Sequence, residues 1–184
     1  MKIKHVPNLL SIIRLLLVPV FVYLMLTKKT VVAVVVFILS GVTDILDGYI
    51  ARKNNCISNF GKVLDPLADK LMQFSAFICL WISELVPFWM PVLYFVKELA
   101  TAIGAWAVFK KGKRVVKSHV FGKLATFFVF AFVTVMIVFG ESISSGVTAV
   151  LCAALCLYFV YSCLMYVKTE VIDGKEENGE TDGK

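Results

Sequence analysis

The chain has 184 residues, of which 59% are hydrophobic and 17% are charged, with a formal net charge of +6 and a mean hydropathy of +0.84. A soluble domain of this length can bury only part of so large an apolar fraction, so the composition excludes an ordinary soluble protein. It also excludes a disordered, collagen-like or disulfide-rich secreted chain. We therefore expect an integral membrane protein in contact with the lipid bilayer, and no nucleic-acid partner.

Six apolar runs are each long enough to cross about 30 Å of hydrocarbon as a helix. They predict an all-α, six-transmembrane-helix bundle with helices near residues 9–27, 30–52, 61–82, 87–109, 120–140 and 144–167. Basic residues collect in the loops on one side of this topology, which predicts a multi-pass protein of the cell membrane with both termini in the cytoplasm. The five cysteines lack CxxC spacing, so we expect them to be reduced packing residues.

The acidic residues are unevenly distributed along the chain. Six of the 13 lie in residues 170–184, which leaves seven acids and 17 of the 19 bases in residues 1–169. We therefore expect one membrane domain over residues 1–169 and a disordered, acidic cytoplasmic tail over residues 170–184. Four of the seven remaining acids fall within 26 consecutive residues, and these are Asp44, Asp47, Asp65 and Asp69.

Helical spacing organises the acids of the second predicted helix. Asp44, Asp47, Gly48 and Ala51 follow one another at i, i+3, i+4 and i+7. Residues at these intervals share one face of a helix. The second helix is therefore expected to carry a stripe of two carboxylates followed by two small residues.

The third predicted helix repeats this order. Gly61, Asp65 and Asp69 follow at i, i+4 and i+8, and the connection over residues 53–60 is only eight residues long. A short connection favours antiparallel neighbours, so the two stripes are expected to face each other and to bring four carboxylates together.

Charged side chains at membrane depth cost about 3 kcal/mol or more each, so four carboxylates require compensation by protonation, bases or metal. Bases are scarce, with Arg52, Lys62 and Lys70 among the few cations nearby in sequence. Carboxylate oxygens suit Mg²⁺ or Mn²⁺, and four carboxylates can hold two such ions. The cluster therefore predicts a two-metal site for a substrate rich in anionic oxygens, such as a phosphate.

The small residues of both stripes have two interpretations. Gly48, Ala51 and Gly61 leave room for a ligand beside the helix backbone, and the forked guanidinium of Arg52 matches a diphosphate. The alternative for the small residues is close helix packing, which is common in membranes. For the third helix, the alternative is that Asp65 is an N-cap and that the helix begins after it.

The pattern Asp44-x2-Asp47-Gly48-x2-Ala51-Arg52-x8-Gly61-x3-Asp65-x3-Asp69 resembles the signature of the CDP-alcohol phosphatidyltransferases, integral membrane phosphotransferases of phospholipid synthesis. The resemblance covers residues 5–167 and implies a homodimer with its active site open to the cytoplasmic leaflet. It implies that the four aspartates bind two divalent cations, Mg²⁺ or Mn²⁺, and that Asp69 is also the catalytic base. The same resemblance implies that the nucleotide of CDP-diacylglycerol binds at Asp47, Gly48, Ala51, Arg52 and Gly61.

The stretches 7–14 and 60–70 further resemble the phosphatidylglycerophosphate synthases of this family. That resemblance implies transfer of a phosphatidyl group to glycerol 3-phosphate, giving phosphatidylglycerophosphate and CMP. A dianionic acceptor requires cations, and the candidate acceptor-binding residues are Arg14, Lys97, Arg114 and Lys123. Ala125 departs from this branch, which typically has a lysine there. Phosphatidylglycerol, the acceptor of the similar cardiolipin synthases, and other alcohols remain alternatives.

Two of these cations have other interpretations. Lys97 lies beside Glu98, so it is alternatively a lysine that is paired for structural reasons. Arg114 belongs to a basic cluster in residues 110–117 that is also typical of a positive-inside anchor on anionic headgroups.

Two other classes of membrane protein use buried acids. An ion or proton transporter predicts acids spread along a transmembrane path, whereas these four gather towards the cytoplasmic side. An intramembrane prenyltransferase also pairs aspartates with metal and diphosphate, but such chains resemble a bundle of about nine spans.

Overall fold

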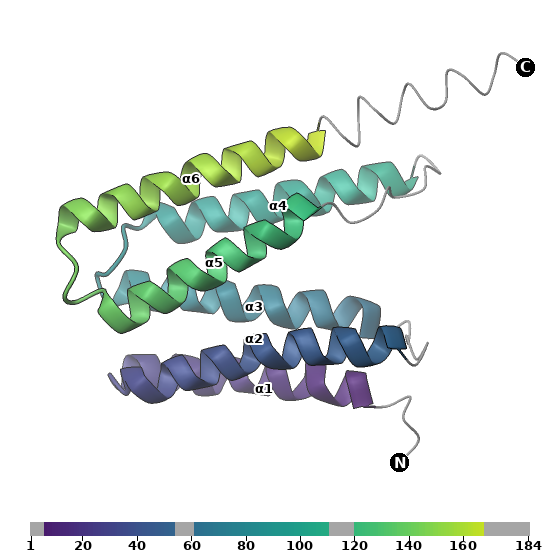
Figure 1. The fold of residues 1–184 in the computed structure, drawn as a ribbon, viewed down its shortest axis with the longest axis horizontal. Coiled ribbons are helices and arrows are strands. Elements are labelled where there is room, and N and C mark those ends of the chain that lie inside the picture. The colour runs from purple at the N-terminus through teal and green to yellow at the C-terminus, as the bar shows by residue number, and fades with distance from the viewer. Residues whose placement is uncertain (1–5, 54–60, 111–119, 168–184) are drawn as a thin grey trace, which may run out of the picture. The chain divides into compact units, whose positions relative to one another are not determined.

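The computed structural model describes the backbone of residues 6–53, 61–110 and 120–167, and side chains within residues 11–44, 66–104 and 126–165 (Figure 1). Within these ranges all regular structure is helical, which confirms the all-α prediction and the number of helices. The helices are α1 (Val6–Leu26), α2 (Thr30–Lys53), α3 (Gly61–Ile82), α4 (Trp89–Lys110), α5 (Val120–Phe139) and α6 (Ser145–Val167). The predicted acidic tail, residues 170–184, lies outside the described residues.

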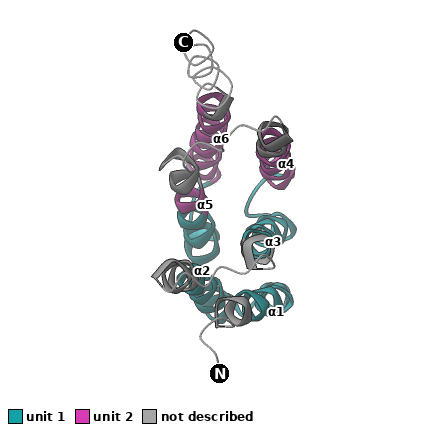
Figure 2. Ribbon diagram, turned by 90° about the vertical axis from the view of Figure 1, so that its right-hand side faces the viewer, with its two compact units in different colours: residues 1–87, 130–144 teal, residues 88–129, 145–184 magenta. Residues whose placement is uncertain are grey.

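The chain divides into two compact units, coloured separately in Figure 2. The first unit comprises residues 1–87 and 130–144, and the second comprises residues 88–129 and 145–184. Helix α5 therefore begins in the second unit and ends in the first.

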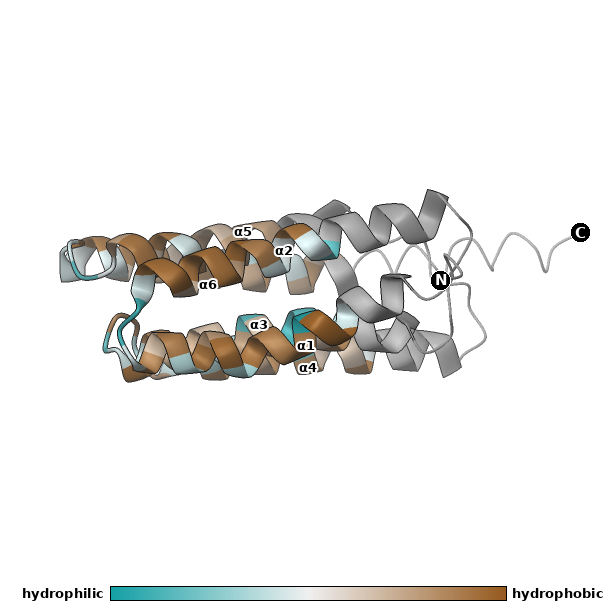
Figure 3. Ribbon diagram, turned by 90° about the horizontal axis from the view of Figure 1, so that it is seen from below, coloured by the Kyte–Doolittle hydropathy of each residue, from teal (hydrophilic) through white to brown (hydrophobic). Residues whose placement is uncertain are grey.

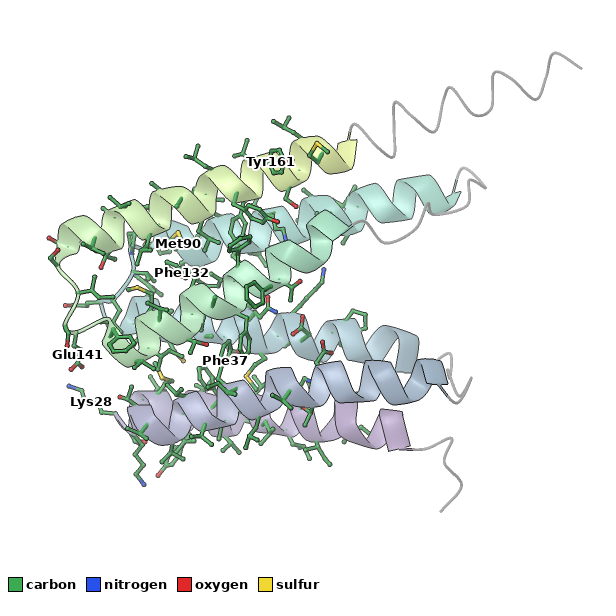
Figure 4. All side chains as sticks on the ribbon, viewed as in Figure 1. Lys28, Phe37, Met90, Phe132, Glu141 and Tyr161 are labelled. Atoms are coloured by element: carbon green, nitrogen blue, oxygen red, sulfur yellow. The ribbon has the colours of Figure 1, made fainter. Side chains whose placement is uncertain are left out.

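In the first unit α1 packs against both α2 and α3, and α2 also contacts α3. The predicted contact between the helices that carry the acidic stripes is thus confirmed. Aromatic rings fill the core: Phe37 of α2 stacks on Phe130 of α5 with ring centroids 4.8 Å apart, and Phe21 of α1 lies 5.6 Å from Phe37. Phe77 of α3 stacks on Phe132 of α5 at 6.0 Å, and Figure 4 labels Phe37 and Phe132 among the side chains.

Gly41 leaves room on α2 for the ring of Phe130, which belongs to α5, within the first unit. A Cβ built on Gly41 lies only 2.5 Å from Cε2 and 2.8 Å from Cζ of Phe130. These distances are far inside ordinary van der Waals contact, so a larger residue would displace the ring of Phe130 from its stack on Phe37. Because Gly41 is one helical turn before Asp44, this contact helps to fix the segment of α2 that carries the acids.

In the second unit α4 packs against α6. The ring of Tyr94 lies 6.2 Å from that of Phe159, and Sγ of Cys156 lies 3.8 Å from Sδ of Met90. Cys79, Cys152, Cys156 and Cys163 are free thiols, and the first two are buried. These four agree with the expectation of reduced packing residues, whereas Cys56 lies outside the described residues.

Apolar side chains are exposed on the described parts of all six helices, among them Leu16, Val31, Leu71, Phe95, Phe127 and Leu157. Figure 3, coloured by residue hydropathy, shows that the helices are mostly hydrophobic (brown) and that turns joining them are more hydrophilic. Burial in lipid is the favourable environment for such surfaces.

By length and composition, the described residues contain one helix suited to crossing a membrane, Ser145–Met165. The described parts of three further helices are apolar but shorter: Ser11–Leu26, Thr30–Asp44 and Thr126–Phe139. The six-helix prediction is therefore confirmed for the helices, and the six membrane crossings stay a prediction.

Candidate active site

The backbone of α2 and α3 carries both predicted acidic stripes in helical conformation. Helix α2 continues to Lys53, so Asp44, Asp47, Gly48, Ala51 and Arg52 all lie on one uninterrupted helix. The predicted intervals of three and four residues therefore place the two acids and two small residues of the stripe along one face of α2.

Helix α3 begins at Gly61, so Asp65 is its fifth residue and Asp69 its ninth. The alternative in which Asp65 caps a helix that starts after it is therefore wrong. Pro66 lies inside α3 as well, and the helix continues through it to Ile82.

Asp44 has a basic partner that its sequence neighbourhood does not reveal. The Nη1 atom of Arg14 on α1 donates to Oδ1 of Asp44 at 2.7 Å, across 30 residues of chain. The Arg14 side chain is fully buried at 0% exposure, whereas the Asp44 side chain is 39% exposed. Pairing with a base therefore compensates one of the four acids, although the sequence pointed only to cations close to the stripes.

Asp69 also has a partner that the sequence reasoning missed. The Nε2 atom of Gln73, one turn later on α3, lies 3.1 Å from both Oδ1 and Oδ2 of Asp69. Gln73 is buried, with 4% exposure. The available signal was the single amide of α3, four residues after Asp69.

The described carboxylates suit a hard divalent cation, because they supply oxygen donors from a partly exposed position. Asp44 and Asp69 are both intermediate in exposure, and each has one carboxylate orientation fixed by a neighbouring donor. Among the residues whose side chains are described, no group of three or more His, Cys, Asp or Glu is placed to hold a metal. Asp47 and Asp65 are outside that set, so the convergence of all four acids stays a prediction.

The predicted acceptor-binding residues divide between the two units and the undescribed part of the chain. Arg14 belongs to the first unit and is engaged with Asp44. Lys97 belongs to the second unit, where its Nζ pairs with Glu98 at 2.5 Å and lies 5.6 Å from the centroid of the Phe159 ring. Lys123 lies on α5 outside the described side chains, and Arg114 lies outside the described residues altogether.

A cavity of about 700 Å³ in the first unit lies away from the acids. Lys28, Val31, Glu84 and Glu141 are among its lining residues. Figure 4 shows Lys28 and Glu141 at the same end of the helices. Asp44 lies 13 residues after Val31 on α2, about 20 Å along the helix axis at 1.5 Å per residue. This cavity is therefore separate from the predicted metal site.

Comparison with known proteins places these features in a family. The family model described as CDP-alcohol phosphatidyltransferase matches residues 4–167. The CDP-diacylglycerol–glycerol-3-phosphate 3-phosphatidyltransferase of Bacillus subtilis is 34% identical over 137 residues, which cover 66% of this chain and 70% of the relative.

Other similar proteins are named as cardiolipin synthases. A putative cardiolipin synthase of Mycobacterium tuberculosis is 36% identical over 140 residues, covering 74% of this chain and 66% of the relative. The cardiolipin synthase (CMP-forming) of Streptomyces coelicolor is 34% identical over 132 residues, covering 68% of this chain and 61% of the relative. The chain thus spans about two thirds of the length of these relatives. It belongs to the CDP-alcohol phosphatidyltransferase family of enzymes.

Proposed function

We propose that the protein transfers the phosphatidyl group of CDP-diacylglycerol to glycerol 3-phosphate, forming phosphatidylglycerophosphate and releasing CMP in phospholipid biosynthesis. The observation that carries this proposal is the family match over residues 4–167, together with helical conformation at every fixed position of the aspartate pattern. The Bacillus subtilis relative, which is named for this reaction, supports the choice of acceptor. Membership of an enzyme family argues against the transporter alternative.

Two divalent cations, Mg²⁺ or Mn²⁺, would be held by Asp44, Asp47, Asp65 and Asp69. When bound, such cations neutralise the diphosphate and stabilise the charge on the departing CMP. The partly exposed carboxylates of Asp44 and Asp69 support this assignment, because hard cations prefer anionic oxygen donors.

The remaining residues of the two stripes bind and orient the nucleotide in this proposal. Asp47 contacts the nucleotide, Gly48, Ala51 and Gly61 admit it beside the helix backbone, and Arg52 binds its diphosphate through paired donors.

Asp69 takes the proton of the acceptor hydroxyl as the hydroxyl oxygen attacks the lipid-side phosphorus. The bond between that phosphorus and the oxygen bridging to CMP then breaks. Phosphoryl transfer needs mainly positioning and charge stabilisation from the protein, which the side chains of α2 and α3 would supply.

The acceptor phosphate is assigned to cations outside the aspartate stripes. Lys97, Arg114 and Lys123 are proposed to bind it, with a contribution from Arg14. The contact between Lys97 and Glu98 supports this role for Lys97, because the carboxylate holds the largely buried ammonium group in one position.

A second acceptor, phosphatidylglycerol, has a specific observation in its favour. Relatives named cardiolipin synthase match this chain at an identity similar to that of the Bacillus subtilis enzyme. Ala125 also stands where the glycerol-3-phosphate branch typically has a lysine. The two acceptors give different lipid products, so a single assay separates them.

The protein is proposed to be a multi-pass, homodimeric enzyme of the cell membrane, with both termini and the active site on the cytoplasmic side. The exposed apolar side chains of the helices and the basic loops support this placement.

The test is an assay of the purified protein in detergent with CDP-diacylglycerol, Mg²⁺ or Mn²⁺, and a panel of acceptors. We expect CMP release together with phosphatidylglycerophosphate when glycerol 3-phosphate is present, and loss of both products on chelation. A metal-dependent product from phosphatidylglycerol alone would favour the second acceptor. No product from any acceptor would refute the enzymatic proposal.

A further inference from the structure

We infer that Arg14 is a positioning residue that holds the carboxylate of Asp44 in the orientation a divalent cation requires. This inference rests on the metal site of the proposed function and assigns a role to a residue of α1, outside both acidic stripes. The contact is direct: Nη1 of Arg14 donates to Oδ1 of Asp44 at 2.7 Å.

The two partners differ in burial, because Arg14 is enclosed and Asp44 is partly exposed. A guanidinium taken out of water pays several kcal/mol of desolvation, and Arg14 is completely buried. Asp44 keeps 39% of its side chain exposed, so the pair leaves part of its carboxylate open to a cation. Well-packed apolar residues commonly replace a buried ion pair without loss of stability, so fold stability alone does not account for Arg14.

The contact leaves the carboxylate oriented and accessible at the same time. A lone aspartate on a helix samples several side-chain rotamers, whereas a charge-assisted hydrogen bond to Oδ1 selects one of them. Partners of this kind, which hold a ligand without touching the metal, commonly contribute 10- to 100-fold in metal affinity.

Two effects of Arg14 on cation binding have opposite signs. Its positive charge repels an incoming divalent cation, whereas its hydrogen bond places the carboxylate that receives the cation. If charge dominated, removing Arg14 would tighten metal binding; if positioning dominates, removal weakens it. The inference is that positioning dominates.

The experiment measures Mn²⁺ binding to the full-length protein in detergent, without substrates, by electron paramagnetic resonance of the free ion. We expect Arg14→Gln to weaken binding about 10- to 100-fold and Arg14→Lys to weaken it less. Lys28→Gln is the control, because it also removes one positive charge from the first unit, at the cavity that lies about 20 Å along α2 from Asp44. It should bind Mn²⁺ as the wild type does.

A double-mutant cycle tests whether Arg14 acts through Asp44. Asp44→Asn weakens binding by itself, and in that background Arg14→Gln should cause little further loss. Equal losses in both backgrounds, or wild-type or tighter binding by Arg14→Gln, would overturn the inference. If Arg14→Gln does not fold, the Arg14→Lys variant decides by the same criteria. A wild-type protein that binds no Mn²⁺ would instead refute the metal site of the proposed function.

Discussion

Replacing Gly41 by alanine should destabilise the first unit because the new methyl group meets the ring of Phe130. The built Cβ lies 2.5 Å from Cε2, whereas ordinary contact begins at about 3.4 Å, so the ring must retreat by about 1 Å. Phe37, which is itself buried, stacks against that ring with an interplanar angle of 13° and restricts the retreat. Overpacking of this kind costs about 1–3 kcal/mol. The intrinsic helix preference for alanine over glycine offsets about 1 kcal/mol of this cost, so the free energy of unfolding should fall by about 0–2 kcal/mol in total.

The assay is equilibrium unfolding in mixed detergent micelles, followed by circular dichroism. The most informative comparison is the effect of Gly41→Ala on the free energy of unfolding with and without Phe130. In a Phe130→Ala background the clash is gone, so Gly41→Ala should raise this free energy by about 1 kcal/mol and not lower it. Gly146→Ala is the control, because a Cβ at Gly146 meets nothing within 4 Å, and it should not destabilise. The packing argument is refuted if Gly41→Ala has the same effect whether or not Phe130 is present.

The remaining predictions concern Asp69. Gln73→Leu keeps the volume of the side chain but removes the amide that contacts both carboxylate oxygens of Asp69. In steady-state kinetics, kcat should therefore fall about 10-fold or more with little change in KM. An unchanged kcat would mean that the amide does not position Asp69. Asp69→Asn should abolish turnover while nucleotide binding, measured by equilibrium titration with CDP-diacylglycerol, is retained; normal turnover would exclude Asp69 as the base.

The sequence predicts the helices well because the apolar runs are long and are separated by short polar turns. The predicted runs differ from the observed helices by a few residues at their ends, for example 9–27 against Val6–Leu26 for α1. Helix ends depend on capping and loop geometry, which hydrophobic periodicity does not encode. The helical spacing of Asp44, Asp47, Asp65 and Asp69 follows directly from the regularity of α2 and α3.

The partners of the acids were not predictable in the same way. Arg14 is 30 residues from Asp44 in sequence, and only the packing of α1 against α2 brings the two together. From the sequence Arg14 is simply an intramembrane cation, which fits a substrate ligand equally well. Gln73 is four residues after Asp69, so helical spacing allows their contact. A neutral amide at that spacing does not by itself indicate a partner for a carboxylate, whereas a charged residue would.

We propose above all that this chain performs metal-dependent phosphatidyl transfer to glycerol 3-phosphate. The most direct measurement follows CMP and lipid product together, with purified protein, CDP-diacylglycerol, glycerol 3-phosphate and Mg²⁺. We predict that CMP and phosphatidylglycerophosphate form in equal amounts, and that both disappear when the metal is chelated or Asp69 is replaced by Asn. CMP release that persists without metal, or the absence of any lipid product with every acceptor, would contradict the claim.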